Sequence, residues 1–214
     1  MRETGFDITR ARPLSRRFYD RDPRRVAREL LGKLLVRRHG RRLLAGRIVE
    51  VEAYMGKNDP AAHAAAGPTA RNQVLFGPPG FAYVYLIYGN HYCLNVSCLS
   101  EGKAGCVLFR ALEPVAGLAQ MFQARELPLP DGDVRLTDLR LLTTGPGRLT
   151  QALGITRPHD NGKDLTTYSD LTILDDEFHV RKVVTAARVG ITKEAEEKLR
   201  YVVAGNPFVS GSQK

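Results

Sequence analysis

Two strand-like runs on either side of a short glycine turn constrain the fold most strongly. Residues 81–88 and 91–99 are rich in aromatic and β-branched side chains, and Gly89-Asn90 between them is typical of a hairpin turn. A further run at 105–112 ends at Glu113-Pro114 and predicts the next strand. Because these strands follow one another without regular helical crossovers, we expect an α+β domain with a mostly antiparallel sheet.

The remaining segments predict helices, further strands and one long connection. Asp22-Pro23 is typical of a helix start, and the apolar residues in 26–35 fall at helical spacing, so we expect a helix that runs toward Gly40. Residues 43–55 predict a strand, whereas Gly and Pro punctuate 56–80 and predict a long, functional loop. Further expectations are helices at 115–126, 148–153 and around 193–200, a loop at 127–138, and strands at 171–175, 180–191 and 201–203.

Positive charge is concentrated at the start of the chain. Residues 1–47 contain 15 Lys and Arg against 5 Asp and Glu, a net charge of +10, whereas residues 48–214 have a net charge of −1. An acidic macromolecular partner would suit this segment, because Lys and Arg that neutralise phosphates release counterions. A solvated basic surface is the alternative.

A chain of 214 residues can form one domain with a sizeable core, or at most two small ones. Residues 1–19 lack clear periodicity and Pro13 interrupts them, so we expect a flexible or loosely docked segment there. The predicted organisation is a basic N-terminal arm at 1–17 and a single domain at 18–214.

Cysteine use and hydropathy indicate the compartment. Cys93, Cys98 and Cys106 are odd in number and form no C-x-x-C pair, so neither a disulfide framework nor a zinc site is indicated. We expect three buried, apolar thiols. No apolar run approaches the roughly 18 residues of a membrane span, and the N-terminus lacks the apolar region of a secretory signal. The expected place is therefore the cytoplasm, with no membrane contact.

Two carboxylates mark a candidate site on the strand at 43–55. Glu50 and Glu52 must point to one sheet face, because side chains alternate along a strand. Two carboxylates on one face repel each other unless one is solvated or paired, and we expect Glu50 to face solvent. Tyr54 shares the face of Glu52, so this strand offers a general base and a stacking ring together.

Further aromatic side chains follow this strand. His63 in the next loop can supply a second ring, and Tyr83 and Tyr85 share one sheet face, where we interpret Tyr83 as structural. Tyr88, beside the glycine turn, is placed to protrude. Together these parts suit an enzyme that cuts a base from DNA. Such an enzyme extrudes the nucleotide into a pocket of flat π surfaces and wedges the gap, and a carboxylate activates water and stabilises the sugar cation.

A series of short motifs runs in collinear order over roughly residues 18–211. They are Glu50-Val51-Glu52-Ala53-Tyr54-Met55-Gly56, Ala61-Ala62-His63, Tyr83-Val84-Tyr85-Leu86-Ile87-Tyr88-Gly89, Leu94-Asn95-Val96-Ser97, Leu108-Phe109-Arg110-Ala111-Leu112-Glu113-Pro114, Gly145-Pro146-Gly147-Arg148-Leu149, Arg188-Val189-Gly190-Ile191 and Gly205-Asn206-Pro207-Phe208-Val209-Ser210. Together they are highly specific, and the chain resembles the 3-methyladenine (alkyladenine) DNA glycosylase family. The resemblance implies a curved sheet flanked by helices, similar to the C-terminal domain of a formyltransferase.

The resemblance also implies a role for seven side chains. Glu52 matches the general base that activates the attacking water, and Arg110 matches the basic residue that helps to position this water and the adjacent phosphate. Tyr88 matches the side chain that intercalates through the minor groove. Asn95 matches the pocket amide whose bulk disfavours a guanine-type 2-amino group. The aromatic walls around the flipped base are matched by Tyr54, His63 and Tyr85.

The implied activity is that of a monofunctional DNA glycosylase. It would act as a monomer on double-stranded DNA containing damaged purines, with access to chromosomal DNA and without a metal or cofactor. Alkylated purines are the implied substrates, and deaminated adenine is a further candidate. No Lys lies among the matched site residues, so no Schiff-base lyase step is expected.

Two other functions stay open. A non-catalytic nucleic-acid-binding domain of the same fold would not need a carboxylate that faces its ligand. A nucleosidase acting on free nucleosides would not need a basic arm, and its substrate affinity would lack a steep dependence on salt.

Three features differ from the family pattern or allow two interpretations. The family commonly has a Trp after the Arg-Val-Gly match, whereas this chain has no Trp and looks shorter at 192–198. His91 stands near Tyr88 where an aromatic residue would be usual. Gly145-Pro146-Gly147 could cradle a phosphate on backbone N–H groups or merely turn the chain.

Overall fold

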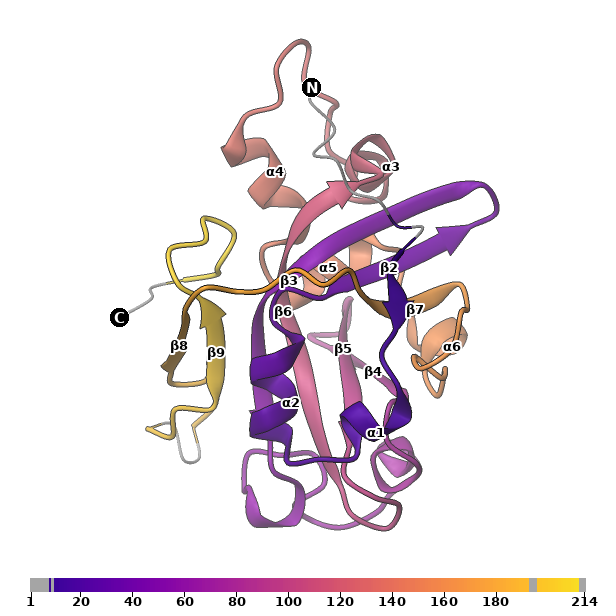
Figure 1. Cartoon of the computed structure of the whole chain (residues 1–214), viewed down its shortest axis with the longest axis vertical. Coiled ribbons are helices and arrows are strands. Elements are labelled where there is room, and N and C mark those ends of the chain that lie inside the picture. The colour runs from indigo at the N-terminus through magenta and orange to yellow at the C-terminus, as the bar shows by residue number, and fades with distance from the viewer. Residues whose placement is uncertain (1–7, 9, 193–195, 212–214) are drawn as a thin grey trace.

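Strand β3 is the centre of the fold, and the sheet is built around it (Figure 1). The computed structural model describes residues 8, 10–192 and 196–211, and within them nine strands form one sheet in the order β1-β7-β2-β3-β6-β5-β4. Strand β9 also pairs with β3, and β8 pairs with β9. Every pairing is antiparallel, which confirms the predicted fold class. The strands are β1 (Arg12–Pro13), β2 (Leu34–His39), β3 (Arg42–Tyr54), β4 (Ala82–Ile87), β5 (His91–Cys98), β6 (Gly105–Ala116), β7 (Leu171–Asp175), β8 (Val183–Ala186) and β9 (Arg200–Val203).

Short helices surround the sheet. Helix α2 packs on β3 and β6, helix α5 packs on β5 and β6, and α3 and α4 lie together at one end of the molecule (Figure 1). No helix in the described part of the chain combines the length and the apolar character that a membrane span needs. The helices are α1 (Arg16–Tyr19), α2 (Pro23–Leu30), α3 (Leu118–Ala124), α4 (Leu136–Thr143), α5 (Pro146–Ala152) and α6 (Arg157–Asp160), with 3-10 turns η1 (Gly56–Asn58) and η2 (Gln73–Phe76).

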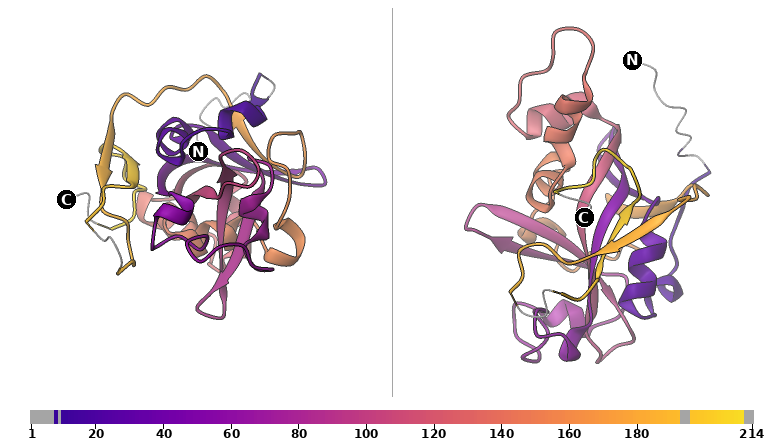
Figure 2. Two further views of the ribbon diagram at one scale, coloured as in Figure 1. Left: turned by 90° about the horizontal axis from the view of Figure 1, so that it is seen from below. Right: turned by 90° about the vertical axis from the view of Figure 1, so that its left-hand side faces the viewer.

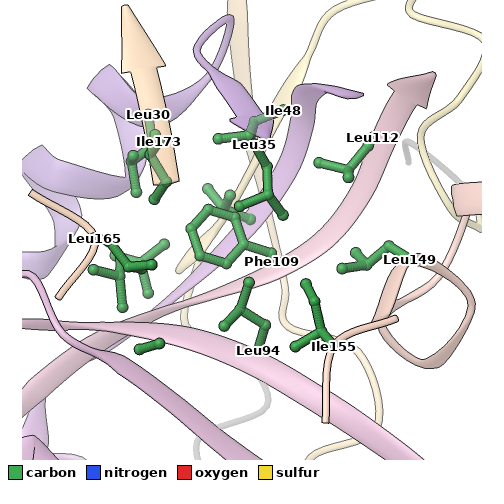
Figure 3. Close-up of a cluster of buried hydrophobic side chains, with 14 of the residues drawn as sticks. Leu30, Leu35, Ile48, Leu94, Phe109, Leu112, Leu149, Ile155, Leu165 and Ile173 are labelled. Carbon is green, nitrogen blue, oxygen red and sulfur yellow. The ribbon is translucent and has the colours of Figure 1, made fainter. Parts of the chain in front are cut away.

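One main core joins these helices to the sheet. The ring of Phe109 on β6 lies at its centre, and Leu30 of α2, Leu94 of β5 and Leu149 of α5 lie around it (Figure 3). All four side chains are fully buried. Buried apolar area is the main favourable term in folding, so this core fixes the strands on which the candidate site is built.

The helix that begins after Asp22 is shorter than predicted. Asp22 caps it by accepting a hydrogen bond from the N–H of Arg24 at 2.8 Å, but α2 ends at Leu30 and β2 follows. Gly32 adopts φ +88°, a left-handed conformation that commonly ends a helix. The first four residues of β2 are all buried, and a continuous apolar run fits a doubly covered strand as well as it fits a helix. The prediction of one continuous helix is therefore wrong.

Residues 10–19 are docked on the sheet. Arg12–Pro13 pairs with β7, and Tyr19 at the end of α1 is fully buried. The expectation of a flexible or loosely docked segment is thus wrong for this part. Residues 1–7 and 9 of the predicted arm lie outside the described residues, and the arm boundary at residue 17 stays a prediction.

Two further segments differ from the predictions. Helix α4 begins inside the predicted loop at 127–138, because the Asp138 carboxylate accepts hydrogen bonds from the backbone N–H and the guanidinium group of Arg135 at its start. The strand predicted at 180–191 is shorter, as β8 covers only Val183–Ala186. For the charged helix predicted around 193–200, residues 193–195 lie outside the described residues, 196–199 are not helical, and β9 begins at Arg200.

Candidate active site

A pocket of about 390 Å³ opens where β3, β4, β5 and β6 meet the start of α5 and residues 189–191. Its lining is mostly aromatic and apolar, which suits a flat organic ligand. Glu52 contacts three of the lining residues, Tyr54, Arg110 and Val189. The other predicted site residues that line the pocket are His63, Tyr85, Tyr88 and Asn95.

Strand β3 departs from regular pairing where its two glutamates lie. The register with β6 shifts between Ile48 and Glu50 and again between Glu50 and Val51. Such irregularities increase the local twist and re-aim side chains. Both glutamate side chains are 0% exposed, so the expectation that Glu50 faces solvent is wrong. Instead, Glu50 and Glu52 both reach the guanidinium group of Arg110 on β6.

Two cations offset these two buried carboxylates. Nε of Arg110 donates to Oε1 of Glu50 at 3.0 Å, and its Nη1 lies 3.3 Å from Oε1 of Glu52. Nε of Arg200 donates to Oε1 of Glu50 at 2.7 Å. The N–H and hydroxyl of Ser210 add hydrogen bonds to Glu50 of 2.6 and 2.9 Å. An unpaired charge at such a depth would be strongly destabilising, and the network avoids one.

Burial and the hydrogen-bond partners of Glu52 act on its pKa in opposite directions. Its Oε1 accepts a hydrogen bond from the N–H of Val189 at 2.7 Å, and its Oε2 accepts one from the Tyr54 hydroxyl at 3.1 Å. Burial raises the pKa of Glu52 above its ordinary value, while Arg110, Val189 and Tyr54 act in the opposite direction. A carboxylate in such surroundings can take up a proton more readily than one in water.

The aromatic side chains form a connected wall. The ring centroid of His63 lies 4.5 Å from that of Tyr85 at an interplanar angle of 70°. Nδ1 of His63 lies 3.0 Å from the hydroxyl oxygen of buried Tyr83, so Tyr83 fixes the imidazole. Loss of hydration and then the positive charge of Arg71 lower the pKa of His63. A neutral ring suits stacking against a base.

Asn95 is a buried polar residue of the pocket lining. It is 3% exposed, and its Nδ2 donates to the carbonyl of Tyr83 at 3.1 Å, which fixes the orientation of the amide. Cys93 and Cys106 line the pocket beside it, and Cys98 lies in the main core. All three cysteines are free and buried, which confirms the expectation of apolar thiols.

Tyr88 occupies the tip of the β4–β5 hairpin, which extends away from the rest of the sheet (Figure 2). Its φ of 53° is left-handed, an unusual conformation for a large side chain, and the next residue, Gly89, has φ 75°. Tyr88 is 85% exposed, and Leu86 nearby is 44% exposed. The prediction from sequence that this side chain protrudes is therefore confirmed.

A buried ion pair beside the pocket is absent from the sequence predictions. Asp59, in the loop after β3, accepts hydrogen bonds from both terminal nitrogens of Arg188, whose guanidinium carbon lies 4.7 Å from the Tyr54 ring centroid. Arg188 belongs to a matched motif, but 129 residues separate it from Asp59, so no local spacing could have paired them.

The glycine turn before α5 also reaches the pocket. Pro146 and Gly147 line it, and a Cβ atom at Gly147 would lie 3.1 Å from Cγ of His91. Glycine here lets α5 approach the β4–β5 hairpin closely. Whether the turn also holds a phosphate stays a prediction.

In the described part of the chain, one group of His and acidic side chains has ligand atoms close enough to share a metal ion: His159, Asp160 and Asp170. Nζ of Lys163 lies 2.9 Å from Asp160 and 2.6 Å from Asp170, and Arg37 pairs with the same two carboxylates at 2.7 and 2.8 Å, so two cations already offset their charges. The group does not border the pocket.

Similarity to known proteins extends over most of the chain. The model of the family described as methylpurine-DNA glycosylase (MPG) matches residues 17–207. Curated relatives carry the name "Putative 3-methyladenine DNA glycosylase". The one from Koribacter versatilis (strain Ellin345) is 60% identical over 202 residues, 94% of this chain and 94% of the relative. The one from Methanoculleus marisnigri (strain ATCC 35101 / DSM 1498 / JR1) is 49% identical over 90% of this chain and 96% of the relative. The one from Anaeromyxobacter sp. (strain Fw109-5) is 45% identical over 92% of this chain and 92% of the relative.

Proposed function

The chain belongs to the methylpurine-DNA glycosylase family, and from this premise we propose that it is a monofunctional DNA repair glycosylase. Its substrate would be duplex DNA containing 3-methyladenine, for which its relatives are named, or a related alkylated purine, with deaminated adenine as a further candidate. The chain would act as a monomer, since six of the seven predicted site residues line one pocket of a single chain and Glu52 contacts its lining.

We assign the bond-breaking step to Glu52. The damaged nucleotide leaves the base stack, and its base enters between Tyr54, His63 and Tyr85. The bond from C1′ to the base nitrogen breaks, its electron pair leaves with the base, and the Glu52 carboxylate stabilises the oxocarbenium-like sugar. Water then adds its oxygen to C1′ and gives a proton to Glu52. An alkylated purine that carries a positive charge departs as a neutral base and needs little acid assistance.

One observation carries this proposal: a fully buried carboxylate borders an aromatic pocket. Glu52 is 0% exposed and contacts Tyr54 and Arg110 of the pocket lining. A binding module would gain nothing from a charge buried beside its ligand, since desolvation of the charge is costly. A nucleosidase would not need the exposed Tyr88, because a free nucleoside leaves no gap in a duplex.

Tyr88 is the proposed wedge. Its Ala variant should bind a lesion duplex about 5- to 150-fold more weakly, since stacking of a base on an aromatic ring is worth about 1–3 kcal/mol. The unfolding temperature should not change, because the side chain is 85% exposed. Fluorescence anisotropy with lesion-containing and undamaged duplexes measures the effect, and unchanged affinity for the lesion duplex would remove the wedge role.

The function itself is tested by single-turnover excision. Wild-type protein in excess is mixed with a duplex containing one hypoxanthine or one 3-methyladenine analogue, and free base is measured by chromatography. Release of the base with a strand that breaks only after alkali treatment is the expected result. Tight lesion binding without release would favour the binding module, and breakage without alkali would contradict the monofunctional assignment.

A further inference from the structure

We infer that Asp59 and Arg188 act as one positioning unit for the base pocket, an inference that rests on the proposed function. Nη1 and Nη2 of Arg188 lie 2.5 and 3.0 Å from Oδ2 and Oδ1 of Asp59. Such a two-point contact fixes the plane of the guanidinium group as well as its position. The two side chains are 0% and 1% exposed, so solvent does not compete for the contact.

The first group that this pair positions is Tyr54. The guanidinium carbon of Arg188 lies 4.7 Å from the centroid of the Tyr54 ring, and Nη1 donates to the carbonyl of Ala53 at 3.2 Å. The cation therefore supports the ring and holds the backbone beside it. Because Tyr54 also lines the pocket, the orientation of its ring depends on the orientation of the Arg188 guanidinium group.

The second group is the loop between Tyr54 and His63. The carboxylate of Asp59 accepts hydrogen bonds from the N–H groups of Met55 and Ala61, both at 3.0 Å. It therefore ties the start of this loop to a point just before His63. We therefore expect the distance between the Tyr54 and His63 rings to depend on the hydrogen bonds that Asp59 accepts in this loop.

The third group is Glu52. Val189 follows Arg188 in the chain, and its N–H donates to Oε1 of Glu52 at 2.7 Å. Fixing Arg188 therefore fixes a donor to the proposed base. One ion pair thus joins two stacking walls and the carboxylate, although neither of its members lines the pocket.

A second two-point contact between an arginine and an aspartate provides a matched control. Arg47 makes the same two-point contact with Asp176, at 3.0 and 2.7 Å, and its guanidinium carbon lies 4.1 Å from the ring centroid of Phe178. This pair does not border the pocket. Asp176→Asn therefore reproduces the chemical change of Asp59→Asn at a site without a proposed role in excision.

The test compares Asp59→Asn, Arg188→Gln and Asp176→Asn with wild type. The single-turnover rate constant at saturating enzyme is measured with the lesion duplex, together with affinity for undamaged duplex and the unfolding temperature. Under saturation this rate constant does not depend on the fraction of folded protein, so it reports pocket geometry and not stability. Asp59→Asn and Arg188→Gln should slow excision about 10- to 100-fold, as small misplacements of reacting groups do.

The control variant Asp176→Asn should retain the wild-type rate constant even if its unfolding temperature falls. Retention of the wild-type rate constant by Asp59→Asn would overturn the inference while leaving the proposed function intact. An equal loss in Asp176→Asn would also overturn it, because the effect would then be one of general stability. Absence of base release by wild type would overturn the proposed function and the inference with it.

Discussion

Glu50 and Glu52 are two residues apart on one strand and are both fully buried, yet their surroundings differ. Glu50 accepts hydrogen bonds from the guanidinium groups of Arg110 and Arg200 and from both the N–H and the hydroxyl of Ser210. Glu52 lies 3.3 Å from the guanidinium of Arg110, and its hydrogen bonds within the described residues come from a backbone N–H and a tyrosine hydroxyl.

This difference shows that neighbours, and not position on the strand, decide what a carboxylate can do. Glu50 fastens β9 and the segment around Ser210 to β3, so its surroundings suit an anchor. Glu52 borders the pocket and has a pKa that burial raises, so its surroundings suit a base. Variants of the two glutamates and of their partners can separate the two roles.

The largest effect is expected from Glu52→Gln. Loss of the base should slow single-turnover excision about 10²- to 10⁴-fold, the usual contribution of a general base. Affinity for the lesion duplex should remain, since the amide keeps the shape of the side chain. Excision close to the wild-type rate would contradict the assignment of Glu52 as the base.

Glu50→Gln should act mainly on stability. It removes the carboxylate charge that pairs with Arg110 and Arg200, and breaking a buried pair costs about 3–5 kcal/mol. Urea unfolding followed by circular dichroism measures the loss. A variant as stable as wild type would contradict the anchor role.

The pH dependence of excision should follow Glu52. A base acts only when it is ionised, so the rate should rise as pH increases through the Glu52 pKa, and this rise should lie above the ordinary value of 4.5. Tyr54→Phe removes a donor that favours the charged form, and should move the rise to higher pH. Single-turnover rates across a pH series measure both positions, and a downward shift in Tyr54→Phe would be inconsistent with this assignment.

The smallest effect is expected from Ser210→Ala, which removes one hydroxyl donor from Glu50 as Tyr54→Phe does from Glu52. It should lower the free energy of unfolding by about 1 kcal/mol. The pH at which excision rises should stay where it is in wild type. If this pH moved as far as in Tyr54→Phe, the two carboxylates would have to be treated as one coupled group.

Local signals in the sequence predicted the middle of the fold correctly. The strands predicted at 43–55, 81–88, 91–99 and 105–112 are confirmed as β3, β4, β5 and β6, because alternation and turn chemistry act over a few residues. The leucine-rich run after α2 was ambiguous, since a strand covered on both faces lacks alternation. Helix α4 was missed because its start depends on two charged side chains within a polar segment.

The candidate site, like the fold, could be predicted from the sequence only in part. The sequence motifs indicated which side chains gather around the pocket, and six of the seven predicted residues line it. The pairs that hold them in place join residues far apart in the chain: Asp59 with Arg188 across 129 positions, and Glu50 with Arg200 across 150. Only tertiary structure brings such partners together, so no spacing rule could have found them.

The branching of the sheet at β3 has a consequence for motion. Residues 50–52 pair with β6 on one side and β9 on the other, so their amide protons lie between two strands. Hydrogen exchange there should require opening of a large part of the molecule, whereas the exposed turn at Tyr88 should exchange through local fluctuations. The most protected amides and some of the least protected would then lie within one site. The carboxylate of Glu52 would be held rigidly, whereas the turn at Tyr88 could adapt to the DNA duplex.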